Sequence, residues 1–121
     1  MHYSIEILKE QKMIQLTVHG ELTKDNALLM NQEAHQVGRE NGISKYLVDV
    51  TDARNVESVA NNYQLAYKDM KHETYDRHAK VAFLVHPEDH SHDFVEMVFF
   101  NSGFNVKLFK EKDHALSFLA E

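Results

Sequence analysis

The chain has 121 residues, of which 43% are hydrophobic and 26% charged, which is typical of one globular domain over residues 1–121. Its formal net charge of −6 argues against nucleic acid as a partner. The absence of cysteine excludes disulfides and thiolate metal sites and favours a cytoplasmic location, and no apolar run approaches the roughly 20 residues that span a bilayer.

The first third of the chain predicts a β-hairpin and a long helix. Residues 3–8 and 13–19 alternate apolar and polar side chains, which is the period of half-buried strands. The short polar link between them favours an antiparallel pair, and the same alternation argues against a signal peptide. Thr23 is the candidate N-cap of a helix that runs to about Asn41, with Gly42 at its C-terminal cap.

The rest of the chain alternates strand and helix. Residues 46–50 and 80–85 are short apolar runs typical of buried strands, and the first run is followed by a polar turn. Helices are expected over residues 58–77 and 91–102, with Gly103 capping the second of them and Phe104 folding back against its last turn. A short strand over residues 106–109 then leads to a terminal helix with Asp113 as its N-cap.

The order β-β-α-β-α-β-α-β-α predicts an α/β domain. Its sheet is expected to be mainly parallel and five-stranded, with right-handed crossovers, one antiparallel edge strand and about four helices. The first two strands should pair as a hairpin, and the apolar runs should form the core. The expected core residues are Leu47, Val48, Phe83 and Leu84.

Four segments together resemble the SpoIIAA-like group of proteins: VHGELT at residues 18–23, KYLVDVTDAR at 45–54, KVAFLVHP at 80–87 and NVKLFKEKDHALSFL at 105–119. That group shares its fold with STAS domains, the anti-sigma-factor antagonists, and more distantly with CRAL-TRIO lipid-binding domains. The resemblance covers nearly the whole chain and rests on structural motifs. It therefore implies a single STAS-type domain without a catalytic signature.

The resemblance also implies a place for a regulatory phosphoserine. In the anti-sigma antagonists an Asp-Ser-Ser-Gly motif begins the helix after the middle strand, and Ser58 aligns with its phosphoacceptor, with Glu57 on the neighbouring serine. The chain lacks the glycine and the aspartate of that motif, which argues against a phosphorylation switch. The hydroxyl of Ser58 is instead expected to cap the helix.

Polar side chains that follow the strand over residues 46–50 form the first candidate site. Open α/β sheets bind ligands at the carboxyl ends of their strands. The predicted polar rim of such a site is Asp49, Asp52, Arg54 and Ser58. This rim is the functional alternative to a structural role, in which Asp49 bonds nearby backbone amides or Arg54 while Asp52 and Arg54 lie in an exposed loop.

Residues 86–93 are rich in histidine and carboxylate side chains. His90 and His92, with carboxylates on both sides, could hold a divalent ion. Their spacing matches no recognised zinc pattern, so a solvated loop that caps the next helix is the preferred interpretation. We therefore expect no metal and no cofactor. Since no nucleophile–base pair is recognised either, we do not expect an enzyme.

The helix expected over residues 91–102 carries the apolar run FVEMVFF, interrupted only by Glu96. A helix on one face of a sheet needs a single apolar stripe. Part of this run must therefore face neighbouring helices, a dimer contact, a bilayer interface or the wall of an apolar pocket, with tyrosines of the preceding helix as the opposite wall. The predicted ligand-binding residues are Tyr63, Tyr67, Met70, Phe94, Met97, Val98 and Phe100.

The sequence thus favours a non-enzymatic binding module for a small apolar or lipid-like ligand. Such a module would be cytoplasmic, with peripheral contact to the inner face of the membrane and a homodimer as further options. The alternative is a regulatory protein–protein interaction module of the anti-sigma-factor-antagonist type. An enzyme that uses residues 86–93 or the region of Asp49 ranks third.

Overall fold

The computed structural model describes residues 2–58, 60–61, 64, 78–101 and 103–121. Its strands are β1 (His2–Leu8), β2 (Met13–Leu22), β3 (Lys45–Asn55), β4 (Lys80–Leu84) and β5 (Asn105–Phe109). Its helices are α1 (Lys24–Asn41), α3 (Asp93–Asn101) and α4 (Lys112–Ala120). The helix expected over residues 58–77 falls largely outside the described residues. Within that range positions 58, 60, 61 and 64 are described, and the last three are helical.

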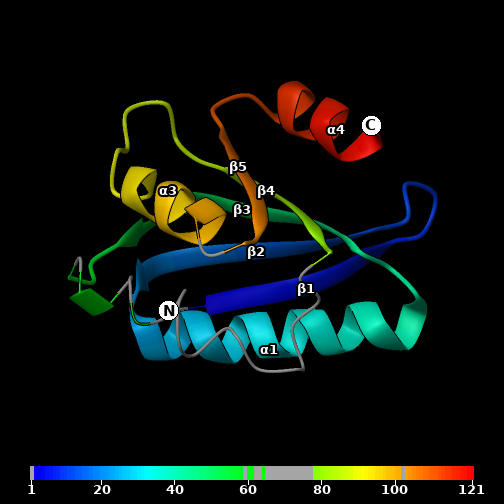
Figure 1. The fold of residues 1–121 in the computed structure, drawn as a ribbon, viewed down its shortest axis with the longest axis horizontal. Helices are drawn as coiled ribbons and strands as arrows, with labels where there is room; N and C mark the ends of the chain where they lie inside the picture. The colour runs from blue at the N-terminus through cyan, green and yellow to red at the C-terminus, as the bar shows by residue number, and fades with distance from the viewer. Residues whose placement is uncertain (1, 59, 62–63, 65–77, 102) are drawn as a thin grey trace.

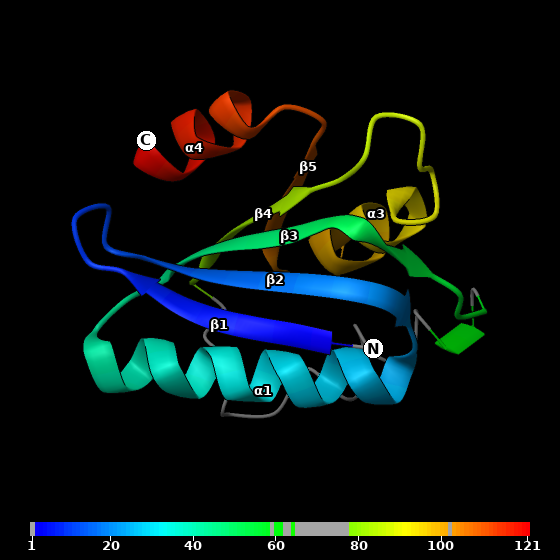
Figure 2. The same cartoon turned by 180° about the vertical axis from the view of Figure 1, so that it is seen from behind.

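The five strands form one sheet in the order β1-β2-β3-β4-β5, so that β1 and β5 are its two edges. β1 pairs with β2 in antiparallel fashion, and the other three pairings are parallel. α1 and α4 lie on opposite sides of the sheet, and α3 lies close to β5 (Figures 1 and 2). The expected fold class, with its antiparallel hairpin at one edge of a parallel sheet, is confirmed.

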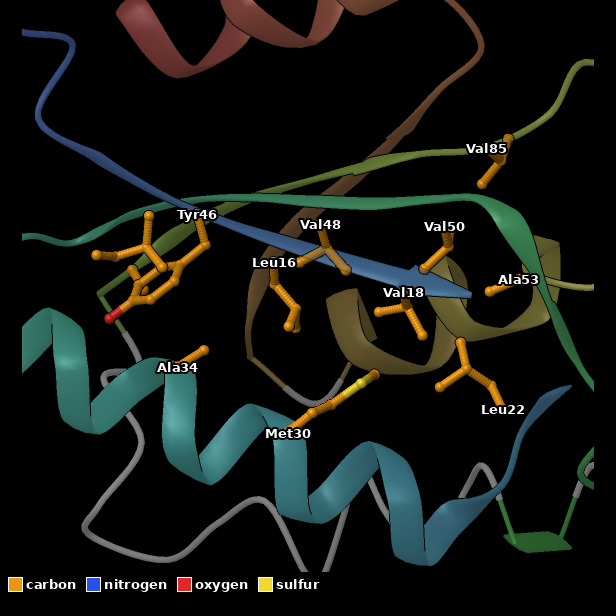
Figure 3. Close-up of a cluster of buried hydrophobic side chains, with 12 residues drawn as sticks. Leu16, Val18, Leu22, Met30, Ala34, Tyr46, Val48, Val50, Ala53 and Val85 are labelled. Carbon is orange, nitrogen blue, oxygen red and sulfur yellow. The ribbon is translucent and has the colours of Figure 1, made fainter. Parts of the chain in front are cut away.

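The larger core lies between the sheet and α1. Leu16 and Val18 from β2 and Val48 and Val50 from β3 point toward α1, where Met30 faces them (Figure 3). These strand residues alternate along their strands, so one face of each strand enters this core.

A close approach fixes the C-terminal half of α1 on the sheet. The ring of Tyr46 stacks on the buried ring of His35, with centroids 4.5 Å apart. Gly38 lies against the same tyrosine, and a Cβ at this position would collide with the hydroxyl group. The helix then ends at Gly42, whose φ of 65° is the left-handed conformation expected of a C-terminal cap.

Another core cluster lies on the other face of the sheet, under α4. Leu47 and Ala82 alternate with the residues of the larger core and meet Ala115 and Leu119 of α4. Three of the four expected core residues, Leu47, Val48 and Leu84, are buried. The fourth, Phe83, is only half-buried, and it is one of the residues that line a small cavity.

The prediction of a polar turn after Val50 is wrong, because β3 continues to Asn55. β2 likewise continues past Gly20 to Leu22, and the two extensions pair with each other from His19 and Asp52 onward, after a shift in register. The backbone of this polar segment therefore finds its hydrogen-bond partners in a neighbouring strand, which the local sequence pattern does not reveal.

Two helix starts also differ from expectation. α4 begins at Lys112, one residue before the expected cap Asp113, and the N-cap position is held by Glu111 without a side-chain bond. α3 begins at Asp93 instead of residue 91. The end of α3 follows expectation, since Gly103 has a φ of 102° and the Phe104 amide donates to the Phe99 carbonyl. Helix ends depend on local hydrogen bonds that composition alone does not fix.

We predict opposite outcomes for two substitutions in α3. Val98 is 3% exposed within the core, so Val98→Asp should cost about 4 kcal/mol or more and unfold the domain, because the charge would be buried without a partner. Phe100 is 63% exposed, so Phe100→Asp should change stability by less than about 1 kcal/mol. Thermal melts followed by circular dichroism measure both changes. Loss of fold in both variants would contradict this division of the helix.

Candidate functional site

The parallel strands end, at their carboxyl termini, on the side of the sheet where the helices begin. β2 ends at Leu22, beside the end of β3 at Asn55, and the Val56 amide donates to the Leu22 carbonyl at 3.0 Å. The loop that follows β4 returns to these carboxyl ends, because the Ser91 hydroxyl accepts a bond of 3.0 Å from the Asn55 amide. Open α/β sheets bind ligands at the carboxyl ends of their strands.

A small cavity lies between α1, α3 and the sheet, near the carboxyl ends of the parallel strands. Its volume is about 40 Å³, enough for a few atoms of the size of a water oxygen. Among the described residues, its apolar lining is Leu22, Ala27, Met30, Phe83, Val95 and Phe99, and its polar lining is Thr23, Asn31, Asn55 and His92. The cavity therefore combines an apolar wall with a few polar groups, as ligand sites do.

His92 is the buried titratable group of this cavity, with 3% of its side chain exposed. Its Nε2 lies 2.9 Å from the Ala53 carbonyl oxygen, which can only accept, so Nε2 carries the proton and donates. The other ring nitrogen, Nδ1, has no hydrogen-bond partner among the described residues. His92 thus offers one acceptor nitrogen that none of the residues described in the structure uses.

The prediction of a solvated loop over residues 86–93 is wrong for His92. The sequence signal that indicates the burial of His92 is its spacing from two apolar residues, because positions 92, 95 and 99 fall on one face of a helix. Val95 and Phe99 are buried on that face. The histidine therefore belongs to the same buried stripe as the apolar residues that line the cavity.

Asp89 supports His92 from the loop. Its Oδ2 lies 3.5 Å from Nε2 of His92, and its Oδ1 accepts a bond of 2.8 Å from the Ser91 amide. Burial alone would raise the pKa of Asp89, but the hydrogen bonds from Ser91 and the nearby His92 and Arg54 lower it overall. The carboxylate is therefore held in its charged form beside the histidine.

A shallow polar depression of about 570 Å³ opens outside this carboxylate. It is lined by Arg54, His86, Glu88, Asp89, His90 and Ser91. The histidines are used within the loop, since His86 Nδ1 accepts from the Glu88 amide and His90 Nδ1 lies 3.1 Å from Asp93. Within the described residues, no group of three histidine and carboxylate side chains is arranged to hold a metal ion.

The four residues of the predicted polar rim have four separate sets of partners. Asp49 accepts bonds from the backbone and the hydroxyl of Thr51, and Asp52 pairs with His19 at 2.7 Å. Arg54 faces the loop of Asp89, and the Ser58 hydroxyl accepts from the Asn61 amide at 3.1 Å. Ser58 therefore has the contact expected of a helix cap.

Glu57 binds residues at the starts of two helices, near the carboxyl ends of the strands. Its Oε2 accepts a bond of 2.8 Å from the Lys24 amide in the first turn of α1, and its Oε1 accepts from the Asn61 side chain at 2.8 Å. The bond from Asn61 is the largest cause that lowers the pKa of Glu57, followed by the bond from Lys24. A carboxylate in this position also interacts favourably with the partial positive charge of a helix N-terminus.

The predicted ligand-binding residues divide into three groups. Tyr63, Tyr67 and Met70 lie outside the described residues. Phe94 is half-buried, and Val98 is in the core with Phe104 and Val106, so Val98 does not supply an exposed wall.

Met97 and Phe100 form the third group, since 53% and 63% of their surfaces are exposed, respectively. They line a separate groove beside β5. The cavity wall that α3 supplies consists instead of Val95 and Phe99. No helix among the described residues combines the length and the apolar character needed to cross a bilayer.

The arrangement is similar to the crystal structure of an uncharacterized protein of the DUF3478 family from Shewanella loihica PV-4, which has a SpoIIAA-like fold. The TM-score is 0.58 with 20% sequence identity, over 98% of this chain and 92% of that chain. The protein therefore has the SpoIIAA-like fold that its sequence predicts. No protein-family model and no curated protein matches the chain. The likeness extends to the fold and not to a function.

We predict that Glu57→Gln lowers the free energy of unfolding by about 1 kcal/mol near neutral pH, because it removes the charge at the two helix starts. The lowered pKa means that the stabilisation is present above the ordinary pKa of the carboxyl group and is lost as the pH falls through the lowered value. Urea unfolding of both proteins at about pH 7 and about pH 3 measures this difference.

The matched control is Glu10→Gln, because Glu10 is an exposed residue of the β1–β2 turn. This control should leave stability nearly unchanged at both pH values. A deficit for Glu57→Gln that is equally large at low pH would show that the charge of Glu57 does not stabilise the helix starts.

Proposed function

We propose that the protein is a non-enzymatic binding module for a small amphipathic ligand, with its site in the cavity between α1 and α3. The observation that carries this proposal is the buried His92 beside an apolar lining, with Nδ1 left without a partner among the described residues. A buried acceptor without a donor is costly, so a ligand that donates a hydrogen bond to it would gain affinity.

The size of the cavity limits which part of a ligand enters it. About 40 Å³ accepts a group of a few atoms, such as a hydroxyl-bearing end, and not a whole acyl chain. The remainder of a lipid-like ligand would have to extend outward past Phe83 and Val95, whose apolar surfaces favour contact with hydrocarbon. A neutral donor end fits Nδ1 better than an ionised carboxylate, because a carboxylate can only accept.

His92 supports binding rather than catalysis. Its Nε2 is committed to the Ala53 carbonyl, which fixes the tautomer and the orientation of the ring. Among the described residues no nucleophilic side chain is paired with it. The absence of cysteine supports a reducing cytoplasmic location, and peripheral membrane contact remains part of the proposal for a lipid-like ligand.

The second candidate is a regulatory protein–protein module, which is favoured by the fold and by the exposed position of Ser58 at a helix start. The carboxylate of Glu57 accepts from the Ser58 amide at 3.3 Å, so it lies beside the hydroxyl that would be phosphorylated. A phosphate there would meet like charge. The ligand-binding proposal therefore ranks first.

We predict that native protein extracted with organic solvent releases a small amphiphile detectable by mass spectrometry. His92→Gln should reduce the amount about tenfold, because a glutamine can keep the bond to Ala53 while it removes Nδ1. Ala27→Leu, which fills the cavity from α1, should also reduce it while the melting temperature is retained.

The control is His114→Gln, since His114 is an exposed residue of α4 that pairs only with Glu111 among the described residues. It should leave the extracted ligand unchanged. If no amphiphile is released by the native protein, or if the folded His92 and Ala27 variants carry as much ligand as the native protein, the proposed site is wrong.

A further inference from the structure

The exposed apolar residues of α3 lie beside a free edge of the sheet. Met97 and Phe100 line a groove of about 490 Å³ together with residues of β5 and with Phe118 of α4. β5 is the last strand in the sheet order, so its outer side carries no strand among the described residues. An apolar groove along an unpaired strand is a place where another strand can add.

The backbone of β5 identifies which groups face outward. The Phe109 carbonyl accepts a bond of 2.9 Å from the Val85 amide, so this residue points its backbone groups toward β4. Successive residues of a strand alternate in direction, which turns the backbone groups of Val106 and Leu108 to the outer side. The Val106 amide and carbonyl have no partner among the described residues.

Glu96 occupies one of these outward positions. Its carboxylate accepts a hydrogen bond from the Leu108 amide, which blocks that donor from a neighbouring strand. Glu96 is also the one polar residue within the apolar run FVEMVFF of α3. A charge turned toward an edge strand is a known means of preventing uncontrolled pairing.

The two walls of the groove differ in chemistry. On the α3 side, Met97 and Phe100 offer apolar surface. On the α4 side lie Phe118 and the exposed Lys107, whose Nζ is 5.7 Å from the centre of the Phe109 ring. Because side chains alternate along a strand, an added strand would present one face to each wall.

We propose that β5 receives an extended segment of a partner protein as a sixth strand. The segment alternates apolar residues, which pack on Met97 and Phe100, with acidic residues, which face Lys107. Its backbone pairs with Val106 and displaces the carboxylate of Glu96 from the Leu108 amide. Pairing of β5 with β5 of a second copy fits less well, because it sets Lys107 of both chains on one face of the joined sheet.

The test uses a labelled seven-residue peptide that alternates valine and glutamate, with binding measured by fluorescence anisotropy. The native protein should bind it, and Phe100→Asp should weaken binding about tenfold. Glu96→Ala should tighten binding, since it frees the Leu108 amide. Lys107→Glu should reverse the preference toward a peptide that carries lysine in place of glutamate.

Two controls separate strand addition from general stickiness. Leu29→Asp changes another exposed apolar residue, on α1 and outside the groove, and should leave binding unchanged. A peptide with N-methylated backbone amides should lose binding, because it cannot form the strand ladder. Circular dichroism checks that each variant is folded.

Three results would overturn the proposal. The first is no binding of the alternating peptide by either the native protein or Glu96→Ala. The second is equal binding of the N-methylated peptide. The third is self-association of the native protein that Phe100→Asp abolishes in a sizing measurement, which would make a second copy the occupant. None of these results depends on His92 or on the cavity.

Discussion

Because β2 and β3 remain paired as far as Leu22 and Asn55, two helix starts are brought together at the carboxyl ends of these strands. The chain leaves β2 directly into α1, with Thr23 as the cap, and leaves β3 through Val56, whose amide still donates to the Leu22 carbonyl. Glu57 can then reach the first turn of α1. If the two strands separated after Val50, neither this contact nor the floor of the cavity would have a fixed position.

The loop after β4 is held at the same end of the strands by one buried and one part-buried hydrogen bond. Ser91 accepts from the Asn55 amide and His92 donates to the Ala53 carbonyl, so two consecutive loop residues satisfy the backbone of β3. Hydrogen bonds of this kind are strong in a low-dielectric interior, and losing one partner is costly. The loop therefore sets the start of α3, and α3 sets one wall of the cavity.

α3 serves both sides of its own axis. Val95 and Phe99 complete the cavity and the core beside it, while Met97 and Phe100 face the groove along β5. Glu96 lies between these two sets and closes part of the edge by binding the Leu108 amide. One nine-residue helix thus explains why the run is apolar on more than one side without requiring that it enter a membrane.

The architecture can be predicted from local sequence signals, because each apolar run has the period and the flanking residues of one element. Alternation in residues 3–8 and 13–19 predicts the hairpin, the runs around Leu47 and Leu84 predict buried parallel strands, and Thr23 and Gly42 mark the ends of α1. These signals are local, so they can be read without knowing which segments meet.

The roles of the polar residues depend on contacts between segments that are distant in the sequence. The extension of β3 to Asn55 depends on a partner strand some thirty residues earlier in the chain, and the burial of His92 depends on the Ala53 carbonyl. The division of α3 into Val98 in the core and Phe100 at the surface depends on where β5 lies. Composition cannot supply these answers, because a polar group is stabilised or exposed according to partners that are distant in sequence.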